Sequence, residues 1–351
     1  MIRTHDLTKD FTPKRSDTVH AVKGVTLTVE PGELVAVLGP NGAGKTTTMR
    51  MLTTLIKPTS GTAEVAGFDV VTDPDEVRRR IGYVGQGNGA GHTQRVLDEL
   101  STQGVIYGLD RHAARRRAGE LLEALDLTSL ARRKVSDLSG GQRRRLDVAM
   151  GLVHAPSLLF LDEPSTGLDP HNRANLWDHI MRMRDEYEMT IMLTTHYLDE
   201  ADSMAERVVI IDYGEVIADD TAENLKTNHA GDRIVVGAVS VEAARRLAEI
   251  AGRIPGAREV ALLEGASGLA RSTPPRVAFR VDHGPRVLPE LLRAAHAAGT
   301  EVTTAELSRP TLDDVFLNLT GRSLRETAVD AGTGTTTEGP AGPETTRKDA
   351  A

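Results

Sequence analysis

The chain has 351 residues, of which 39% are hydrophobic and 26% are charged, a balance typical of soluble globular proteins with about two domains. It contains no cysteine, which excludes disulfide bridges, thiolate zinc sites and cysteine nucleophiles. The net charge of −8 argues against a nucleic-acid partner, because phosphate binding needs a basic face. No stretch approaches the roughly 18 consecutive apolar residues of a membrane span, and the N-terminus lacks a signal-like apolar core, so we expect a cytoplasmic protein.

The first two thirds of the chain alternates short apolar runs with helical stretches, which predicts parallel βα units and an α/β fold. Helices are expected over residues 44–55 and in a block over 96–130. Strands are expected at residues 21–29, 33–38, 158–161, 190–194 and 207–211.

Beyond about residue 228 the order of elements becomes strand, helix, strand, strand, helix, strand, which predicts a small α+β domain of the split-βαβ, ferredoxin-like type. These six elements are expected at residues 233–239, 241–251, 258–263, 276–281, 285–298 and 301–307. A terminal helix is expected over 311–319. The residues after 329 include no large apolar side chain, so we expect a disordered tail over 323–351.

A glycine-rich motif lies between an apolar strand and a helix start. Residues 39–46 read GPNGAGKT and match the phosphate-loop pattern G-x-x-x-x-G-K-[ST]. Its glycines let backbone N–H groups turn toward phosphates, Lys45 reaches the β and γ oxygens, and the Thr46 hydroxyl binds magnesium. The motif therefore predicts a phosphate-binding loop for a nucleotide, with Mg²⁺ at Thr46.

Two carboxylates follow the apolar strand at 158–161. Taken alone, a pair such as Asp162 and Glu163 is more often a turn or a helix cap. Beside a phosphate loop, however, Asp162 suits a hard cation, and Glu163 is placed to polarise the attacking water. We therefore expect Asp162 at the metal and Glu163 as the catalytic base.

The string LSGGQ at residues 138–142 distinguishes among nucleotide-binding families. By itself the string is also typical of a helix N-cap at Ser139. A family signature and a helix cap are compatible, because a capped, glycine-rich helix start is itself an anion site. Placed between the phosphate loop and the Asp-Glu pair, it resembles the signature of ABC-type ATPases. The resemblance covers residues 1–225.

The resemblance implies a P-loop NTPase fold with a RecA-like core and a helical subdomain. It places an ATP-binding cassette at residues 1–227, the helical subdomain at about 90–150, and an accessory domain at 228–322. Gln86 matches the glutamine that senses metal and water, and His196 matches the switch histidine at the γ-phosphate. Phe11 matches the adenine-stacking aromatic or, as an alternative, is a core phenylalanine.

The remaining roles follow from the same resemblance. Catalysis is assigned to Lys45, Gln86, Glu163 and His196. The metal is assigned to Thr46, Gln86 and Asp162. Nucleotide contacts are assigned to Phe11, Gly39, Pro40, Asn41, Gly42, Ala43, Gly44, Lys45, Thr46, Thr47, Ser139, Gly141 and Asp169. Because Ser139 and Gly141 serve the partner's nucleotide in this family, the expected unit is a dimer with a second copy or a similar cassette.

Several features narrow the class of ABC ATPase. DNA-organising relatives insert long coiled coils between the phosphate loop and the signature, and excision-repair relatives need cysteine zinc sites, whereas this chain has a compact helical block and no cysteine. Translation-factor relatives carry two cassettes in one chain, and this chain has one. Transport is therefore the leading class, with a soluble ABC ATPase acting on ribosomes or nucleic acid as the alternative.

The C-terminal third of the chain distinguishes between importer and exporter ATPases. Importers often end in a small β-barrel, whereas this region is mixed strand and helix. Residues 309–321, RPTLDDVFLNLTG, resemble the end of drug-exporter ATPases of the daunorubicin-resistance type, although alone they read as an amphipathic helix. The resemblance implies an ATPase at the cytoplasmic face of the membrane that energises efflux of drugs, antibiotics or other amphiphiles through a separate permease. In a third interpretation, residues 230–322 sense a ligand.

Overall fold

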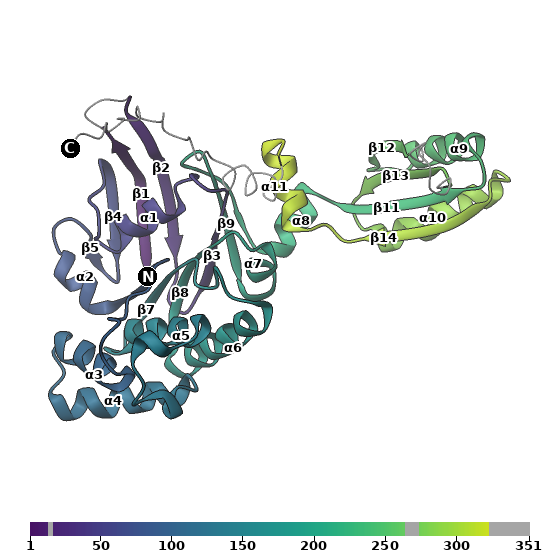
Figure 1. Ribbon diagram of the computed structural model, residues 1–351. Helices are drawn as coiled ribbons and strands as arrows, with labels where there is room; N and C mark the ends of the chain where they lie inside the picture. Colours follow the sequence, from purple (N-terminus) through teal and green to yellow (C-terminus); the bar gives the residue numbers. More distant parts are fainter. Residues whose placement is uncertain (13–16, 264–273, 323–351) are drawn as a thin grey trace, which may run out of the picture.

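The computed structural model describes residues 1–12, 17–263 and 274–322. Figure 1 shows a larger body that carries most of the helices and a smaller body reached through two connecting segments. The described residues form three sheets, two in the larger body and one in the smaller. The tail expected at 323–351 lies outside the described residues.

An antiparallel sheet forms one side of the larger body, in the order β2-β1-β4-β5. Its strands alternate buried and exposed side chains, as expected where one sheet face covers a core and the other faces water. They are β1 (Ile2–Phe11), β2 (Val19–Val29), β4 (Ser60–Val65) and β5 (Phe68–Asp69).

The central sheet has the order β10-β9-β3-β8-β7-β6 and is parallel except for β10. Every residue of β3 and β7 is buried, because helices and the first sheet cover both faces of these middle strands. The strands are β3 (Leu34–Leu38), β6 (Ile81–Val84), β7 (Leu158–Asp162), β8 (Thr190–Thr195), β9 (Arg207–Asp212) and β10 (Glu215–Asp220). The predicted α/β fold with parallel βα units is confirmed.

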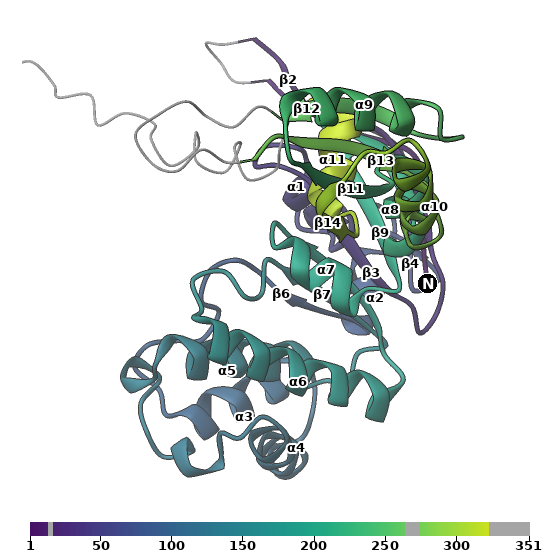
Figure 2. The same ribbon diagram turned by 90° about the vertical axis from the view of Figure 1, so that its right-hand side faces the viewer.

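The helices of this body are α1 (Lys45–Leu52), α2 (Pro74–Arg80), α3 (Val96–Ile106), α4 (Arg111–Ala124), α5 (Gly140–Leu152), α6 (Pro170–Tyr187), α7 (Leu198–Met204) and α8 (Ala222–His229). In Figure 2, α3 to α6 lie together at the end away from the small body.

The helical block predicted over 96–130 is interrupted in the structure. Gly108 adopts φ +93 after α3, and Asp110 begins α4 by accepting hydrogen bonds from two backbone N–H groups. A 3-10 turn at Thr128–Leu130 follows. The helix predicted over 44–55 ends at Leu52, and Thr54 adopts φ +63 just beyond it.

The small body is a four-stranded antiparallel sheet in the order β12-β13-β11-β14 with two helices packed on it. This order and the alternation of elements match the predicted split-βαβ plan. The elements are β11 (Asp232–Ala238), α9 (Val241–Gly252), β12 (Arg258–Leu263), β13 (Arg276–Val281), α10 (Gly284–Ala297) and β14 (Val302–Ser308). Phe279, Ile234 and Leu291 fill a core of its own.

Helix α11 (Leu312–Thr320) leaves the small body and lies beside α8, as Figure 1 shows. Its buried residues Leu312, Val315 and Phe316 join the core that contains Trp177, not that of the small sheet. The sequence grouped this helix with the accessory domain, because an amphipathic pattern shows that a face is buried without showing what covers it. None of the helices within the described ranges has the length and apolar character that a bilayer crossing requires.

Candidate functional site

The phosphate loop connects β3 to α1 and is held tightly between neighbouring backbone segments. Gly44, with φ +105, precedes the first turn of α1, and a Cβ atom there would lie 2.5 Å from the carbonyl oxygen of Ala21. A Cβ atom at Gly39 would lie 2.1 Å from the carbonyl oxygen of Ile211. Only glycine fits these two positions. The loop therefore has a fixed shape that opens on the N-terminus of α1, where backbone N–H groups are free to receive an anion.

Lys45 is 5% exposed and folds back over this loop. Its Nζ donates to the carbonyl oxygens of Gly39 at 2.7 Å and Pro40 at 3.1 Å, and it lies 4.0 Å from Glu163 Oε1. Burial lowers the pKa of Lys45, and the nearby carboxylates of Glu163 and Asp162 partly oppose that shift. Its ammonium group is thus held at the mouth of the loop.

Oxygen ligands for a hard cation meet beside the loop. Thr46 Oγ1 donates to Asp162 Oδ1 at 3.0 Å, Thr194 Oγ1 donates to the same oxygen at 2.6 Å, and Gln86 Nε2 donates to Thr46 Oγ1 at 3.3 Å. Asp162 Oδ2 is buried and has no hydrogen-bond partner in the described part of the chain. A hydroxyl group, a carboxylate with one unsatisfied oxygen and an amide fit Mg²⁺, which takes few protein ligands and completes its shell with phosphates and water.

Glu163 lies at the end of β7 with its backbone in the left-handed region at φ +49. Its N–H donates to the carbonyl oxygen of Thr194 at 3.0 Å, and its Oε2 lies 3.3 Å from His196 Nδ1 and accepts from Thr166 Oγ1 at 3.3 Å. The hydrogen bond from His196 is the main cause that lowers the pKa of Glu163, against the opposing effect of burial. The carboxylate is therefore ionised and able to accept a proton.

The signature residues lie apart from this cluster. Ser139 caps α5: its Oγ accepts from Gln142 N at 3.3 Å, and Gln142 Oε1 accepts from Ser139 N at 3.0 Å. Asp169 caps α6, with Oδ1 accepting from Asn172 N at 2.9 Å and Oδ2 accepting from Asn172 Nδ2 at 2.6 Å. No hydrogen bond or ion pair between described residues joins Ser139, Gly141 or Asp169 to the phosphate loop. One chain brings together only part of the predicted set.

Phe11 is 42% exposed at the end of β1, where it pairs with Val19, and its ring lies 5.2 Å from Lys9 Nζ. The alternative that it is a core phenylalanine is wrong. Stacking on adenine stays a prediction.

Thr194 is a site residue that was not predicted from the sequence. Parallel pairing of β7 and β8 places it opposite Asp162, where its side chain and carbonyl group support both Asp162 and Glu163. The available signal was its place at the end of a predicted strand, since carboxyl ends of neighbouring parallel strands lie at one sheet edge.

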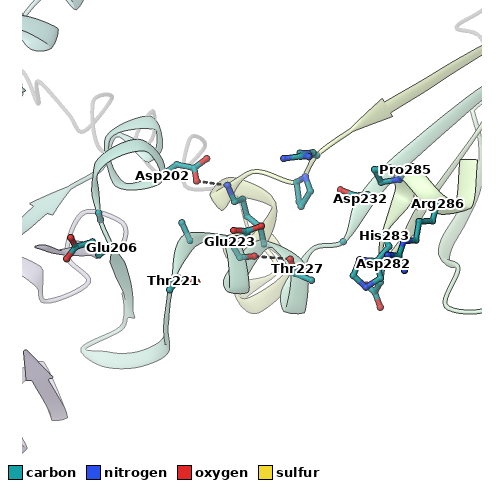
Figure 3. Close-up of a pocket in the computed structure, with 16 residues that line it drawn as sticks. Asp202, Glu206, Thr221, Glu223, Thr227, Asp232, Asp282, His283, Pro285 and Arg286 are labelled. Carbon is teal, nitrogen blue, oxygen red and sulfur yellow. Dashed lines mark hydrogen bonds and ion pairs between the residues drawn. The ribbon is translucent and has the colours of Figure 1, made fainter. Parts of the chain in front are cut away.

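A separate cavity of about 620 Å³ lies between α7, α8 and the small body (Figure 3). None of the predicted site residues lines it. Much of its charge is paired: Lys226 Nζ donates to Asp202 Oδ1 at 2.5 Å, and Arg258 Nη2 donates to Asp282 Oδ1 at 2.6 Å. The interpretation of residues 230–322 as a ligand sensor stays a prediction.

Comparison with known proteins identifies the family. A family model described as ABC transporter matches residues 22–166, and a model of the C-terminal domain of DrrA1-3-like ATP-binding proteins matches residues 221–320. The daunorubicin resistance ATP-binding protein DrrA3 of Streptomyces coeruleorubidus is 42% identical, over 92% of this chain and 98% of that protein. This chain belongs to the DrrA-like ABC transporter ATP-binding proteins. The predicted resemblance is confirmed.

Other relatives of this ABC ATPase are named for resistance or export. The linearmycin resistance ATP-binding protein LnrL of Bacillus subtilis is 33% identical over 87% of this chain and 95% of that protein. The Nod factor export ATP-binding protein I of Cupriavidus metallidurans is 36% identical over 87% of this chain and 94% of that protein. A cassette solved as a dimer in a post-hydrolysis state with ADP and Pi has a TM-score of 0.58 and 27% identity, and covers 63% of this chain and 98% of that one. The chain is thus an ATP-binding subunit and an ATPase of the exporter class.

Proposed function

We propose that this ABC ATPase hydrolyses ATP with Mg²⁺ at the cytoplasmic face of the membrane and energises efflux of drugs or other amphiphiles through a separate permease. The observation that carries the proposal is the cluster of Lys45, Thr46, Asp162, Glu163 and His196 at one edge of the central sheet. The relatives named for resistance to antibiotics or for export support the transport class.

Each residue of the cluster has a role that its contacts allow. The N-terminus of α1 and Lys45 receive the β and γ phosphates, with Lys45 exchanging the carbonyl oxygens of the loop for phosphate oxygens. Thr46, Gln86 and Asp162 would hold the metal. Bound Mg²⁺ supplies positive charge that offsets the charge of the phosphate oxygens.

The carboxylate of Glu163 takes the proton of the attacking water while the water oxygen bonds to the γ phosphorus and the bond to the bridging oxygen of ADP breaks. His196, 3.3 Å from Glu163 Oε2, holds that carboxylate in place and faces the γ-phosphate. The products are ADP and inorganic phosphate.

The working unit is proposed to be a dimer, either of two copies or with a similar cassette. Ser139 and Gly141 at the start of α5 and Asp169 at the start of α6 have no hydrogen bond or ion pair with the phosphate loop within the described chain. An exposed helix start with glycines is suited to an anion from outside, here the γ-phosphate held by the other subunit. The dimeric relative with ADP and Pi supports this arrangement.

Glu163→Gln tests the catalytic part of the proposal. The amide keeps the shape but accepts no proton, so phosphate release from ATP by the full chain is expected to fall by about a hundredfold or more, while ATP binding is retained. Glu186→Gln, at an exposed position on α6, is the matched control and keeps the wild-type rate. Wild-type hydrolysis by Glu163→Gln would show that Glu163 is not the base.

The proposed partner, the separate permease, is tested by cell fractionation. Cells that contain the permease are compared with cells from which it is deleted. The chain is expected in the membrane fraction only when the permease is present. Co-purification with ribosomes, independent of any membrane protein, would support the soluble alternative.

A further inference from the structure

Arg144 lies one turn into α5 and is 7% exposed. Its guanidinium group points at carbonyl oxygens instead of a carboxylate: Nε donates to Pro164 O at 2.6 Å and Nη1 donates to Gly85 O at 2.7 Å. Nη2 lies 3.4 Å from the carbonyl oxygens of Asp162 and Glu163. No ion pair in the described part of the chain involves Arg144. Four backbone carbonyls therefore surround one buried cation.

Burial of this guanidinium group costs free energy, which its hydrogen bonds to the carbonyl oxygens must offset. Burying a cation is unfavourable, and burial lowers the pKa of the Arg144 guanidinium group, a shift that the nearby carboxylates of Asp147 and Asp162 partly oppose. An apolar side chain of similar length would fill the same space without that cost. The planar fork of arginine, however, reaches acceptors in two directions at once, which a single ammonium group does not.

The acceptors belong to two functional loops. Gly85 immediately precedes Gln86, whose amide contacts Thr46 at the proposed metal site. Pro164 immediately follows Glu163, the proposed base. Arg144 thus fixes the distance between the start of the signature helix and both loops.

The backbone of Glu163 needs such support. At φ +49 it has a left-handed conformation that is unfavourable for a non-glycine residue. On its amide side the N–H is bound by the carbonyl oxygen of Thr194 at 3.0 Å. On its carboxyl side the carbonyl oxygens of Glu163 and Pro164 face Arg144. Thr194 and Arg144 hold the strained residue from both sides.

We propose that Arg144 is a positioning residue for ATP hydrolysis, which holds the backbone of Glu163 and of the Gly85–Gln86 segment in register with α5. The signature helix, which receives the partner's nucleotide, is thereby mechanically connected to the base and metal loops of its own subunit. The inference rests on the proposed function, because it takes Glu163 as the base.

Arg144→Lys tests the proposal in the full chain, because it keeps the charge and the stem but removes the fork. We expect kcat for ATP hydrolysis to fall roughly ten- to hundredfold, the loss typical of a misplaced catalytic group, while KM and the equilibrium affinity for ATP stay within about twofold. Arg145→Lys is the matched control: Arg145 follows on the same helix, but its Nη1 lies 3.4 Å from His179 Nε2, away from both loops. It is expected to keep the wild-type kcat.

A double variant separates positioning from general destabilisation. If Arg144 acts through Glu163, adding Arg144→Lys to Glu163→Gln causes little further loss in single-turnover rate, normalised to bound ATP. An undiminished second loss, a wild-type kcat for Arg144→Lys, or equal losses for Arg144→Lys and Arg145→Lys overturns the inference. Arg144→Met, which buries no charge, replaces Arg144→Lys if the latter does not fold. Wild-type hydrolysis by Glu163→Gln alone overturns the proposed function instead.

Discussion

At the scale of single residues, the ionised state of Glu163 depends mainly on His196. The hydrogen bond from the imidazole lowers the pKa of the Glu163 carboxyl group, while burial acts to raise it. His196→Ala removes the hydrogen bond that lowers this pKa most, while burial still acts to raise it. The pKa of Glu163 therefore rises. We predict that the acid limb of the pH–rate profile moves to higher pH, measured as single-turnover phosphate release so that a slow residual rate can be followed.

His171→Ala is the control for this prediction, because His171 is exposed at the start of α6. Its acid limb is expected to coincide with that of the wild type. An unchanged acid limb in His196→Ala would mean that His196 does not set the ionisation of Glu163.

Spacing made part of the site predictable. Lys45 and Thr46 follow from the glycine pattern, and Asp162 follows from its place at a strand end, because these chemistries need fixed local geometry. Thr194 and Arg144 did not follow. Their contacts depend on strand register and on how α5 crosses two loops, and both are properties of packing that residues distant in sequence decide.

At the scale of elements, the start of α5 combines a helix cap with a proposed phosphate site. Ser139→Ala removes the cap, which costs about 1 kcal/mol of stability, and removes the hydroxyl group from the proposed γ-phosphate contact. Ser139→Asp keeps a good cap but places negative charge where phosphate binds. We predict that Ser139→Asp retains thermal stability and loses hydrolysis, whereas Ser139→Ala loses some of both.

Ser240→Ala provides the comparison, because Ser240 caps α9 in the small body. The melting temperature of the small body should fall in Ser240→Ala by about as much as that of the larger body falls in Ser139→Ala, without loss of hydrolysis. Hydrolysis by Ser139→Asp at the wild-type rate would leave the cap as the only role of Ser139.

Helices and strands with a strong apolar pattern were predictable from the sequence. Their exact ends, and the elements against which they pack, were less predictable. Central strands such as β7, which is apolar from Leu158 to Leu161, are placed by the sequence within one residue. The helical block over 96–130 contains a break that was not predicted: Gly108 follows the end of one helix with φ +93, and Asp110 caps the start of the next. Strand β10 is an edge strand with half-exposed side chains and gave no clear signal.

At the scale of the whole molecule, the larger body is built from two separate stretches of the chain, and the small body is built from the stretch between them. The chain leaves the larger body after α8, builds the small sheet, and returns with α11 (Figure 1). Phe316 on α11 is fully buried in the core that holds Trp177, whereas Phe279 on β13 lies in the core of the small body. Trp177 is the one tryptophan of the chain and 1% exposed, so its fluorescence reports unfolding of the larger body.

This arrangement predicts different effects of two equivalent truncations. Phe316→Ala leaves a cavity in the larger core and should lower the free energy of unfolding reported by Trp177 by about 3–5 kcal/mol, although Phe316 lies far from that body in sequence. Phe279→Ala removes the same side chain from the small core and should leave the Trp177 transition in place, because Phe279 packs in a core separate from the one that contains Trp177. Denaturant titrations followed by tryptophan fluorescence measure both. Equal shifts would show that the two cores unfold together, and no shift for Phe316→Ala would show that α11 adds nothing to the stability of the cassette.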